Sequence, residues 1–381
     1  MHIYDYIVIG SGLAGLTTAS KISEETKNIL LIESDAVLGG SNKPAYLKNQ
    51  NFNIKTENGL RFIPSTALSK KSIQSLENQL GVKLIKSSTD NNIETYDANG
   101  FKSFVGFGDK APDCYSQVSY FLNTNEIELT LPVYKIVDLL KEKFQGEILT
   151  KSFVTEFNLT DGQLTHVTVN GSKVYYANNF IYAGTVRELA ELLPDEAMSL
   201  RSKTKLKKDT TWVGLCLDLL HEGKIENKNN LFLLEGTTQD SIGPCIGRFL
   251  NQTETESSSV CQVSQWISFI DLETSEETEN IAEVLKKMKR QIKRAFPEMY
   301  DVVKSERLFV TSALSAGEIK LNSNGTVNKI PNLWLASGQV NQVPNLLGSL
   351  LQAQFVLASL GFGESMIEAE TSENTVEITL G

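Results

Sequence analysis

Hydrophobic and polar positions at the start of the chain follow the order of a strand, a helix and a second strand. Residues 4–9 and residues 28–32 are short apolar runs rich in strand-forming residues, as in buried parallel strands. Between them, apolar residues recur every three positions along residues 13–22, which places them on one face of a helix. This order predicts a βαβ unit whose helix packs on a sheet.

Two later segments have the pattern of further sheet strands. Residues 148–184 alternate apolar and polar positions in short runs that break at residues 160–162 and 170–172. This predicts a strand, a β-meander and a closing strand. Residues 332–336 predict another strand, which is followed by a turn and by a helix from Leu347 onwards.

Residues 210–220 and 260–270 also alternate as sheet strands, and residues 276–296 have the helical spacing of an amphipathic helix. The two strands carry Trp212 and Trp266. Two aromatic rings on a sheet could flank an amine substrate as a cage. Aromatic side chains in such strands belong more often to the core, so both interpretations stay open.

Composition and charge exclude several classes of function. With 381 residues, of which 41% are apolar and 22% charged, the chain can hold two domains with substantial cores. Its formal net charge of −10, without a long basic run to offset it, argues against nucleic acid or an anionic membrane surface as a partner. The longest apolar stretch, residues 346–362, contains two glutamines and is shorter than a bilayer span.

Cysteine and histidine usage predicts no metal site and no redox pair. The chain has four cysteines without CxxC spacing and three histidines. Buried, reduced thiols are the simpler interpretation, and they suit a cytoplasmic protein. The first residues run directly into a strand without a charged and apolar leader, so we expect no signal peptide.

Three glycines follow the first strand in the arrangement GxGxxG. Gly10 allows the tight turn, Gly12 lets the backbone approach a pyrophosphate, and Gly15 permits close packing of helix on strand. The N–H groups at the start of the helix can then bind phosphates. The second strand ends in Glu33, 23 residues after the first glycine, where a carboxylate binds a ribose and disfavours the 2′-phosphate of NADP. The sequence therefore predicts a dinucleotide site.

Glu33 is followed by Gly39 and Gly40, an E-x5-GG arrangement that resembles the glutathione-reductase-like FAD-binding fold. Residues 148–184 resemble the adenine-bracketing segment of the flavin amine oxidase, phytoene desaturase and protoporphyrinogen oxidase superfamily. Residues 330–360 resemble the strand, turn and helix that this superfamily places beside the ribityl chain and the flavin. The resemblance implies an α/β fold: a Rossmann-like FAD-binding domain, with a parallel sheet and a β-meander, plus an inserted α+β substrate domain with a mixed sheet.

The resemblance also implies a discontinuous domain organisation. The expected parts are an FAD-binding domain of residues 1–42, 143–187 and 309–365, a substrate domain of residues 43–142 and 188–308, and a C-terminal tail of residues 366–381.

The cofactor-binding residues that the resemblance implies are Gly10, Gly12, Leu13, Ala14, Gly15, Glu33, Ser34, Gly39, Gly40, Ser41, Gly59, Leu60, Arg61, Val154, Ala183, Gly184, Gly338, Gln339, Asn345, Leu346 and Leu347. Val154 has the adenine-contacting place. Gln339 stands where the superfamily usually has an acid. Ser41 stands where amine oxidases usually have an arginine, so the chain is not a standard amine oxidase. Arg61 stands where a histidine or a small residue is common, and it is either a candidate catalytic residue near the flavin or a surface arginine.

The function that the resemblance implies is that of an FAD-dependent oxidoreductase. Such an enzyme removes hydride from a C–N or C–C bond of a small organic substrate to flavin N5 and is reoxidised by oxygen or another acceptor. We expect non-covalent FAD, since residues 330–360, which resemble the segment beside the flavin, contain neither a histidine nor a cysteine. A homodimer stays open. The alternatives are a non-redox flavin enzyme resembling UDP-galactopyranose mutase and a non-catalytic binding protein of the Rab GDP-dissociation inhibitor type.

Overall fold

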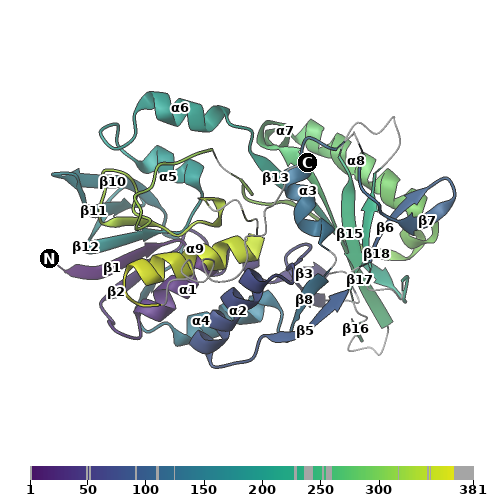
Figure 1. Ribbon diagram of the computed structural model, residues 1–381, viewed down its shortest axis with the longest axis horizontal. Helices are drawn as coiled ribbons and strands as arrows, with labels where there is room; N and C mark the ends of the chain where they lie inside the picture. Colours follow the sequence, from purple (N-terminus) through teal and green to yellow (C-terminus); the bar gives the residue numbers. More distant parts are fainter. Residues whose placement is uncertain are drawn as a thin grey trace.

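The computed structural model describes residues 2–48, 50, 53–90, 92–108, 111–123, 125–226, 230–235, 243–250, 253–254, 260–315, 317–340, 343 and 345–363. The tail expected at residues 366–381 lies outside them. The described residues are organised around two large sheets, which lie at opposite ends of the molecule (Figure 1).

The first sheet has seven strands and joins segments that are far apart in the sequence. In spatial order its strands are β10 (Val154–Thr160), β11 (Gln163–Val169), β12 (Lys173–Tyr182), β1 (Ile3–Ile9), β2 (Ile29–Ile32) and β9 (Glu147–Leu149), and β19 (Leu333–Leu335) also pairs with β12. Strands β12, β1, β2, β9 and β19 are parallel, whereas β10, β11 and β12 form an antiparallel meander. The predicted βαβ unit and meander are therefore confirmed.

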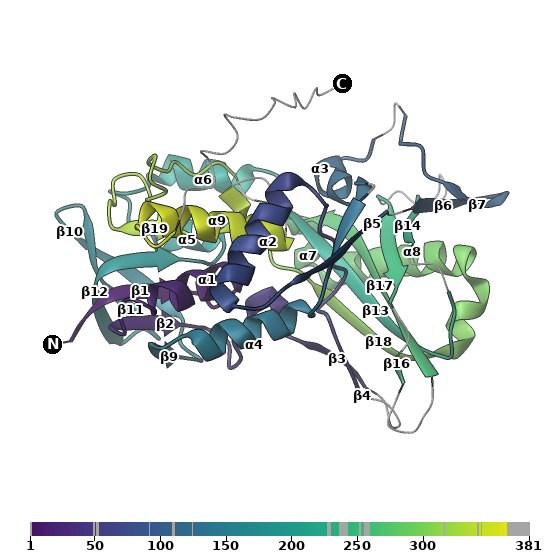
Figure 2. The ribbon, with the colours of Figure 1, turned by 60° about the horizontal axis from the view of Figure 1, so that its bottom comes forward.

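Four helices pack together on one face of this sheet (Figure 2). They are α1 (Leu13–Ile22), α2 (Ala67–Leu80), α4 (Val133–Lys143) and α9 (Asn345–Ser359). Leu16, Ile136 and Leu350 are among the side chains buried between them. α2 and nearly all of α4 fall within residues 43–142 of the expected substrate domain, but their apolar faces complete the core beside α1 and α9. An amphipathic helix must bury its apolar face, and here the first sheet offers the partner surface.

The other face of the first sheet is covered by α5 (Val186–Leu192) and α6 (Leu200–Lys208). Thr185 begins α5 with a capping box, in which its side chain and that of Glu188 exchange hydrogen bonds with each other's backbone N–H. Leu189 and Leu206 bury their side chains against the sheet.

The second sheet is mixed and has eight strands. Its spatial order is β18 (Val303–Val310), β13 (Trp212–Glu222), β17 (Val260–Asp271), β15 (Cys245–Phe249), β14 (Leu231–Leu234), β6 (Ile93–Asp97) and β7 (Gly100–Ser103), and β16 (Thr253–Glu254) also pairs with β17. Strands β14 and β6 pair in parallel, and the other pairs are antiparallel. The expected mixed sheet is present.

Different elements cover the two faces of the second sheet. One face packs against α7 (Leu272–Glu276), α8 (Thr278–Ala295) and the 3-10 helix η3 (Pro297–Val302). The other face meets the hairpin of β3 (Ala45–Lys48) and β4 (Asn53–Thr56), the loop that follows it, and α3 (Tyr115–Val118) with the 3-10 helix η2 (Ser119–Leu122). A separate two-stranded sheet pairs β5 (Ile85–Asp90) with β8 (Asn125–Leu129).

The two tryptophans of these strands lie in different clusters. Trp266 is fully buried in the core beneath α8, and its indole N–H donates to Ser264 Oγ at 2.9 Å. Trp212 packs instead with the cluster on the opposite face. The two rings therefore form no common cage, because successive side chains of a strand point to opposite faces.

The four cysteines, Cys114, Cys216, Cys245 and Cys261, are buried and none is in a disulfide. Within the described ranges, no helix has the length and apolar character needed to cross a bilayer.

Candidate functional site

The glycine turn between β1 and α1 is packed too tightly for any other residue at two of its positions. Gly10 has a φ of +99°, and a Cβ on it would lie 3.1 Å from the carbonyl oxygen of Ala183. A Cβ on Gly15 would lie 1.9 Å from the carbonyl oxygen of Gly10. The turn is thus held between the start of α1 and the end of β12, where Ala183 donates its N–H to the carbonyl of Ile9 at 2.8 Å.

Gly12 is the open position of the same turn. A Cβ on Gly12 would meet no atom of the described chain within 4 Å, and its backbone is unstrained, with φ −60° and ψ 176°. Gly12 caps α1 without a side-chain hydrogen bond, and Leu13, Ala14 and Gly15 behind it are buried. A buried helix start without a side-chain cap needs an acceptor for its N–H groups, and an anion supplies one.

Glu33, at the end of β2, is buried and accepts four hydrogen bonds from its own chain. One carboxylate oxygen accepts from the backbone N–H of Ser11, at 2.9 Å, and from the Ser11 hydroxyl. The other accepts from the N–H of Asp35 at 2.7 Å and from Ser34 Oγ at 3.1 Å. Two of the four donors are hydroxyls that can rotate, so two acceptor positions can pass to a ribose.

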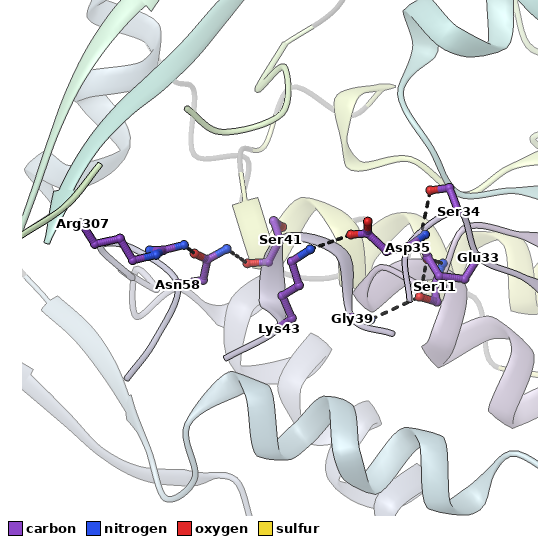
Figure 3. A network of polar contacts seen from close by, with 9 residues as sticks. All are labelled: Ser11, Glu33, Ser34, Asp35, Gly39, Ser41, Lys43, Asn58 and Arg307. Carbon is purple, nitrogen blue, oxygen red and sulfur yellow. Dashed lines mark hydrogen bonds and ion pairs between the residues drawn. The ribbon is translucent and has the colours of Figure 1, made fainter. Parts of the chain in front are cut away.

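Ser11 links the glycine turn to the second glycine pair (Figure 3). The N–H of Gly39 donates to the carbonyl oxygen of Ser11 at 3.0 Å and to its hydroxyl at 3.2 Å. Gly39 and Gly40 both have positive φ, +115° and +53°, and a Cβ on Gly40 would lie 3.2 Å from Cα of Gly12. The predicted E-x5-GG segment therefore lies directly against the glycine turn.

The residue after the glycine pair, Ser41, has an exposed side chain, and its carbonyl oxygen accepts two hydrogen bonds. The donors are Arg61 Nη2 at 2.7 Å and Asn58 Nδ2 at 3.0 Å. The Arg61 side chain is 19% exposed, and its Nε lies 4.0 Å from a carboxylate oxygen of Glu57. Arg61 is accordingly a contact of the Gly-Gly segment and not a free surface arginine.

The start of the meander lies beside the end of β2. Lys151 donates its N–H to the carbonyl of Asp35, and Ser152 donates to the carbonyl of Glu33, both at 2.9 Å. Val154 begins β10 directly after this contact and is partly buried. The structure thus brings Val154 to the part of the site where Glu33 lies.

The C-terminal segment expected at the flavin also packs closely. A Cβ on Gly338 would lie 2.8 Å from the backbone nitrogen of Ser349 in α9. Leu346 and Leu347 are buried. The side chain of Asn345 lies outside the described part of the chain.

Gln339 has a role that the sequence reasoning missed. Its amide oxygen accepts from the N–H of Val186 at 2.7 Å, and its amide nitrogen donates to the carbonyl of Ala313 at 2.5 Å. The amide thereby joins the start of α5 to the segment after β18. A contact of this side chain with a ribityl group stays a prediction.

Gly59 and Leu60 lie against the second sheet. Gly59 has a φ of +82°, and a Cβ on it would lie 2.8 Å from Cζ of Phe309 and 3.5 Å from Sγ of Cys216. Leu60 is buried in the cluster formed with α3 and η2. Just after the end of β12, a Cβ on Gly184 would lie 2.6 Å from the hydroxyl of Tyr182.

A row of polar residues crosses the second sheet beneath this loop. The register places Arg307 opposite Asp218, Asp218 opposite Gln265, and Gln265 opposite Arg248. Residues directly opposite each other share a face of the sheet. This row was not predicted from the sequence, although part of its signal is visible: Asp218 interrupts the otherwise apolar run of residues 212–220.

The charges in the row are paired, and they range from fully buried Asp218 to partly exposed Arg307. Asp218 is fully buried and accepts from Arg307 Nη1 at 2.9 Å. Burial raises the pKa of the Asp218 carboxyl to about 6, against the opposing effect of Arg307. Arg248 makes a two-point ion pair with Glu126, with Nη1 at 3.1 Å and Nη2 at 2.9 Å. Burial also raises the pKa of Glu126.

Residues 8–66 match a family model described as an NAD(P)-binding Rossmann-like domain. No curated protein sequence matches the chain.

Solved structures with a similar fold include proteins of different functions. A protein assigned as a protoporphyrinogen oxidase, from Exiguobacterium sp. 255-15, has 12% identity and a TM-score of 0.63, covering 94% of this chain and 98% of that chain. Wild-type putrescine oxidase bound to putrescine has 10% identity and a TM-score of 0.61, with the same coverage. A Rab GDI from Plasmodium falciparum has 10% identity and a TM-score of 0.54, covering 95% and 99%. At these identities the likeness is one of fold: the chain has a Rossmann-like α/β fold, which it shares with these oxidases and with the Rab GDI.

Proposed function

We propose that the protein is an FAD-dependent oxidoreductase that removes hydride from a C–N or C–C bond of a small organic substrate. Support comes chiefly from the start of α1. There, Gly12 faces open space, whereas Gly10, Gly15 and Gly40 are packed against backbone around it. A buried helix start without a side-chain cap, beside an open glycine, suits a dinucleotide pyrophosphate.

The residues present fit two parts of such a cofactor, the pyrophosphate and the adenosine ribose. The N–H groups of Leu13 and Ala14 would bind the pyrophosphate, with the Gly39–Gly40 segment on its other side. Glu33 would accept from the adenosine ribose once the Ser11 and Ser34 hydroxyls turn away. The E-x5-GG segment and the return of the chain through β12 and α9 favour FAD over the simpler NAD fold.

The other predicted cofactor residues would hold the rest of FAD mainly through their backbone. Val154 would contact the adenine, Ala183 and Gly184 would line the phosphates, and Gly338 and the start of α9 would face the flavin end. In line with this, we propose that residues 1–42, 143–187 and 309–365 supply the cofactor-binding domain and that the second sheet, apart from the last two residues of β18, lies in the substrate domain. α2 and α4, although outside those ranges, pack on the cofactor half.

FAD, when bound, would be the two-electron acceptor for the hydride that the substrate loses, and oxygen or another acceptor would then reoxidise the flavin. The protein's part is to bind, orient and exclude water. Arg61 keeps a permanent positive charge beside the Ser41 carbonyl, which favours an anionic ligand nearby. Leu60, Phe62 and Ile267 form an apolar cluster at the loop that the superfamily places near the flavin, and such a cluster excludes water.

A second candidate is a binding protein that has the fold but no flavin, since the fold also occurs in a Rab GDI. The two candidates differ in cofactor content. The test is the visible spectrum of the purified protein, followed by heating and identification of any released chromophore. Free FAD in the supernatant supports the oxidoreductase and justifies a screen of amines, amino acids and unsaturated precursors. Colourless protein that does not take up added FAD supports the binding protein.

A further inference from the structure

The loop of residues 57–61 bridges the two halves of the molecule. On one side it binds the Gly-Gly segment, because Asn58 and Arg61 both donate to the carbonyl oxygen of Ser41. Ser41 directly follows Gly40, which lies against Gly12. The Ser41 carbonyl therefore belongs to the residue directly after the Gly39–Gly40 segment that we propose for the pyrophosphate.

On its other side the same loop is held by the second sheet. Arg307 Nη2 donates to the side-chain oxygen of Asn58, and Arg307 Nη1 donates to the buried Asp218 at 2.9 Å (Figure 3 shows the first of these contacts). Gln265, the neighbour of Asp218 in the row, donates its amide N–H to the carbonyl of Glu57 at 3.0 Å. The Arg307 guanidinium also lies 4.0 Å from the centre of the Phe309 ring.

The amide of Asn58 is the point where these two sets of contacts meet. Its oxygen accepts from Arg307, and its nitrogen donates to Ser41. Arg307 has only donors, so it fixes which end of the amide faces the sheet and which end faces Ser41. The ion pair with Asp218 and the Phe309 ring hold the guanidinium itself in place.

We propose that Asn58 is a positioning residue that holds the Gly39–Ser41 segment in the shape required for dinucleotide binding, with Arg307 and Asp218 fixing its amide. This inference rests on the proposed function for the identity of the ligand. The contacts through which Asn58 acts do not depend on that identity.

Asn58→Asp separates the two contacts of the side chain. A carboxylate keeps the acceptor for Arg307 but replaces the donor to Ser41 by an oxygen that repels its carbonyl. The matched control is Asn280→Asp, the same chemical change at a partly buried asparagine in the first turn of α8, whose amide contacts only Glu277 among the hydrogen bonds of the described chain. Asn58→Ala, which removes both contacts, serves as a second variant.

Two measurements test the role. The first is hydrogen exchange of the cofactor-free protein in a peptide that covers residues 34–44. The second is titration of each cofactor-free variant with FAD, followed by flavin absorbance. We expect both Asn58 variants to exchange faster in this peptide and to bind FAD about tenfold more weakly. The melting temperature of cofactor-free Asn58→Asp and both measurements on Asn280→Asp should match the wild type.

The outcomes separate the two proposals. If wild-type protein binds no FAD, the proposed cofactor is wrong, and the exchange of residues 34–44 alone decides the role of Asn58. If wild-type protein binds FAD and Asn58→Asp binds it equally well, Asn58 is not a positioning residue. A lower melting temperature with an unchanged FAD affinity of the folded fraction would also overturn the role, since it describes a merely structural contact.

Discussion

Replacing Gly12 by alanine tests the proposed pyrophosphate site with little disturbance of the fold. The new methyl group would meet no atom of the described chain within 4 Å, and the φ of −60° is one that alanine adopts readily. Alanine is a poorer N-cap than glycine by roughly 0.5–1 kcal/mol. It also lowers the entropy of the unfolded chain, which returns about 0.4–1 kcal/mol. We therefore expect the stability of the cofactor-free protein to change by less than about 1 kcal/mol.

The effect on binding should be much larger, because the methyl group occupies the space proposed for the phosphates. If the pyrophosphate moves away and loses one or two charge-assisted hydrogen bonds to backbone N–H groups, the loss is about 2–4 kcal/mol. With about 1.4 kcal/mol for each factor of ten, this weakens FAD binding about 30- to 700-fold.

The assay is titration of cofactor-free protein with FAD, with thermal unfolding measured in parallel with and without FAD. Gly363→Ala is the matched control, since a Cβ there would have its nearest contact at 3.6 Å and would lie far along the chain from the glycine turn. A folded Gly12→Ala protein that binds FAD as tightly as wild type would refute the reasoning, because the open space beside Gly12 would not then be the cofactor's place.

Three further substitutions probe packing and titration. Gly15→Ala should destabilise the protein by about 3 kcal/mol or more, measured by urea unfolding, because its Cβ would lie 1.9 Å from the Gly10 carbonyl oxygen. Asp218 has a folded-state pKa of about 6, above its unfolded value, so its ionisation lowers the free energy of unfolding at pH 7 by about 3 kcal/mol. Acidification from pH 6 to 4 protonates the carboxyl and restores this stability. Asp218→Asn should remove that acid stabilisation from the pH dependence of unfolding. His221, buried beside Ser264, has its pKa lowered by burial to about 4, so its titration alone should contribute a loss of about 3 kcal/mol between pH 6.5 and 4, which His221→Gln should remove.

The titrations of Asp218 and His221 change the stability in opposite directions, so the dependence of wild-type stability on pH is by itself a poor test. Between pH 6 and 4, Asp218→Asn should lose stability more steeply than wild type, whereas His221→Gln should gain. Parallel profiles for all three proteins would contradict both assignments. For Gly15→Ala, an unfolding midpoint equal to that of wild type would show that the glycine turn can relax.

Local patterns in the sequence were sufficient to predict the main elements of the first sheet. The strand–helix–strand order near the N-terminus and the meander depend on periodicity over short windows, and both are confirmed. The amphipathic helix expected at residues 276–296 is α8, Thr278–Ala295. The glycine spacing likewise predicted the tight turn at Gly10 and the close packing at Gly15, because both are properties of the turn itself.

Contacts between distant segments could not be predicted in this way. The row that contains Asp218 exists only through the register of four strands, and register is not visible in one strand's pattern. The hydrogen bond from Arg61 to Ser41 joins two loops whose separation depends on both sheets. For the same reason, the positions of α2 and α4 on the cofactor half follow from which apolar surface lies nearest, and boundaries drawn by sequence order missed them.

Strand β12 has a consequence for the order in which the chain can fold during synthesis. It pairs with β1 from Ile3↔Tyr176 to Ile9↔Tyr182 and with β19 at residues 180–182 and 333–335. The strands from β13 to β18 of the second sheet are synthesised after β12 and before β19. The second sheet can therefore form before β19 leaves the ribosome. The glycine turn contacts Ala183 at the end of β12, so it cannot reach its final packing until about half of the chain has emerged. During translation β1 therefore lacks its partner β12 until that strand emerges, and an unpaired strand edge of this kind favours aggregation of the nascent chain.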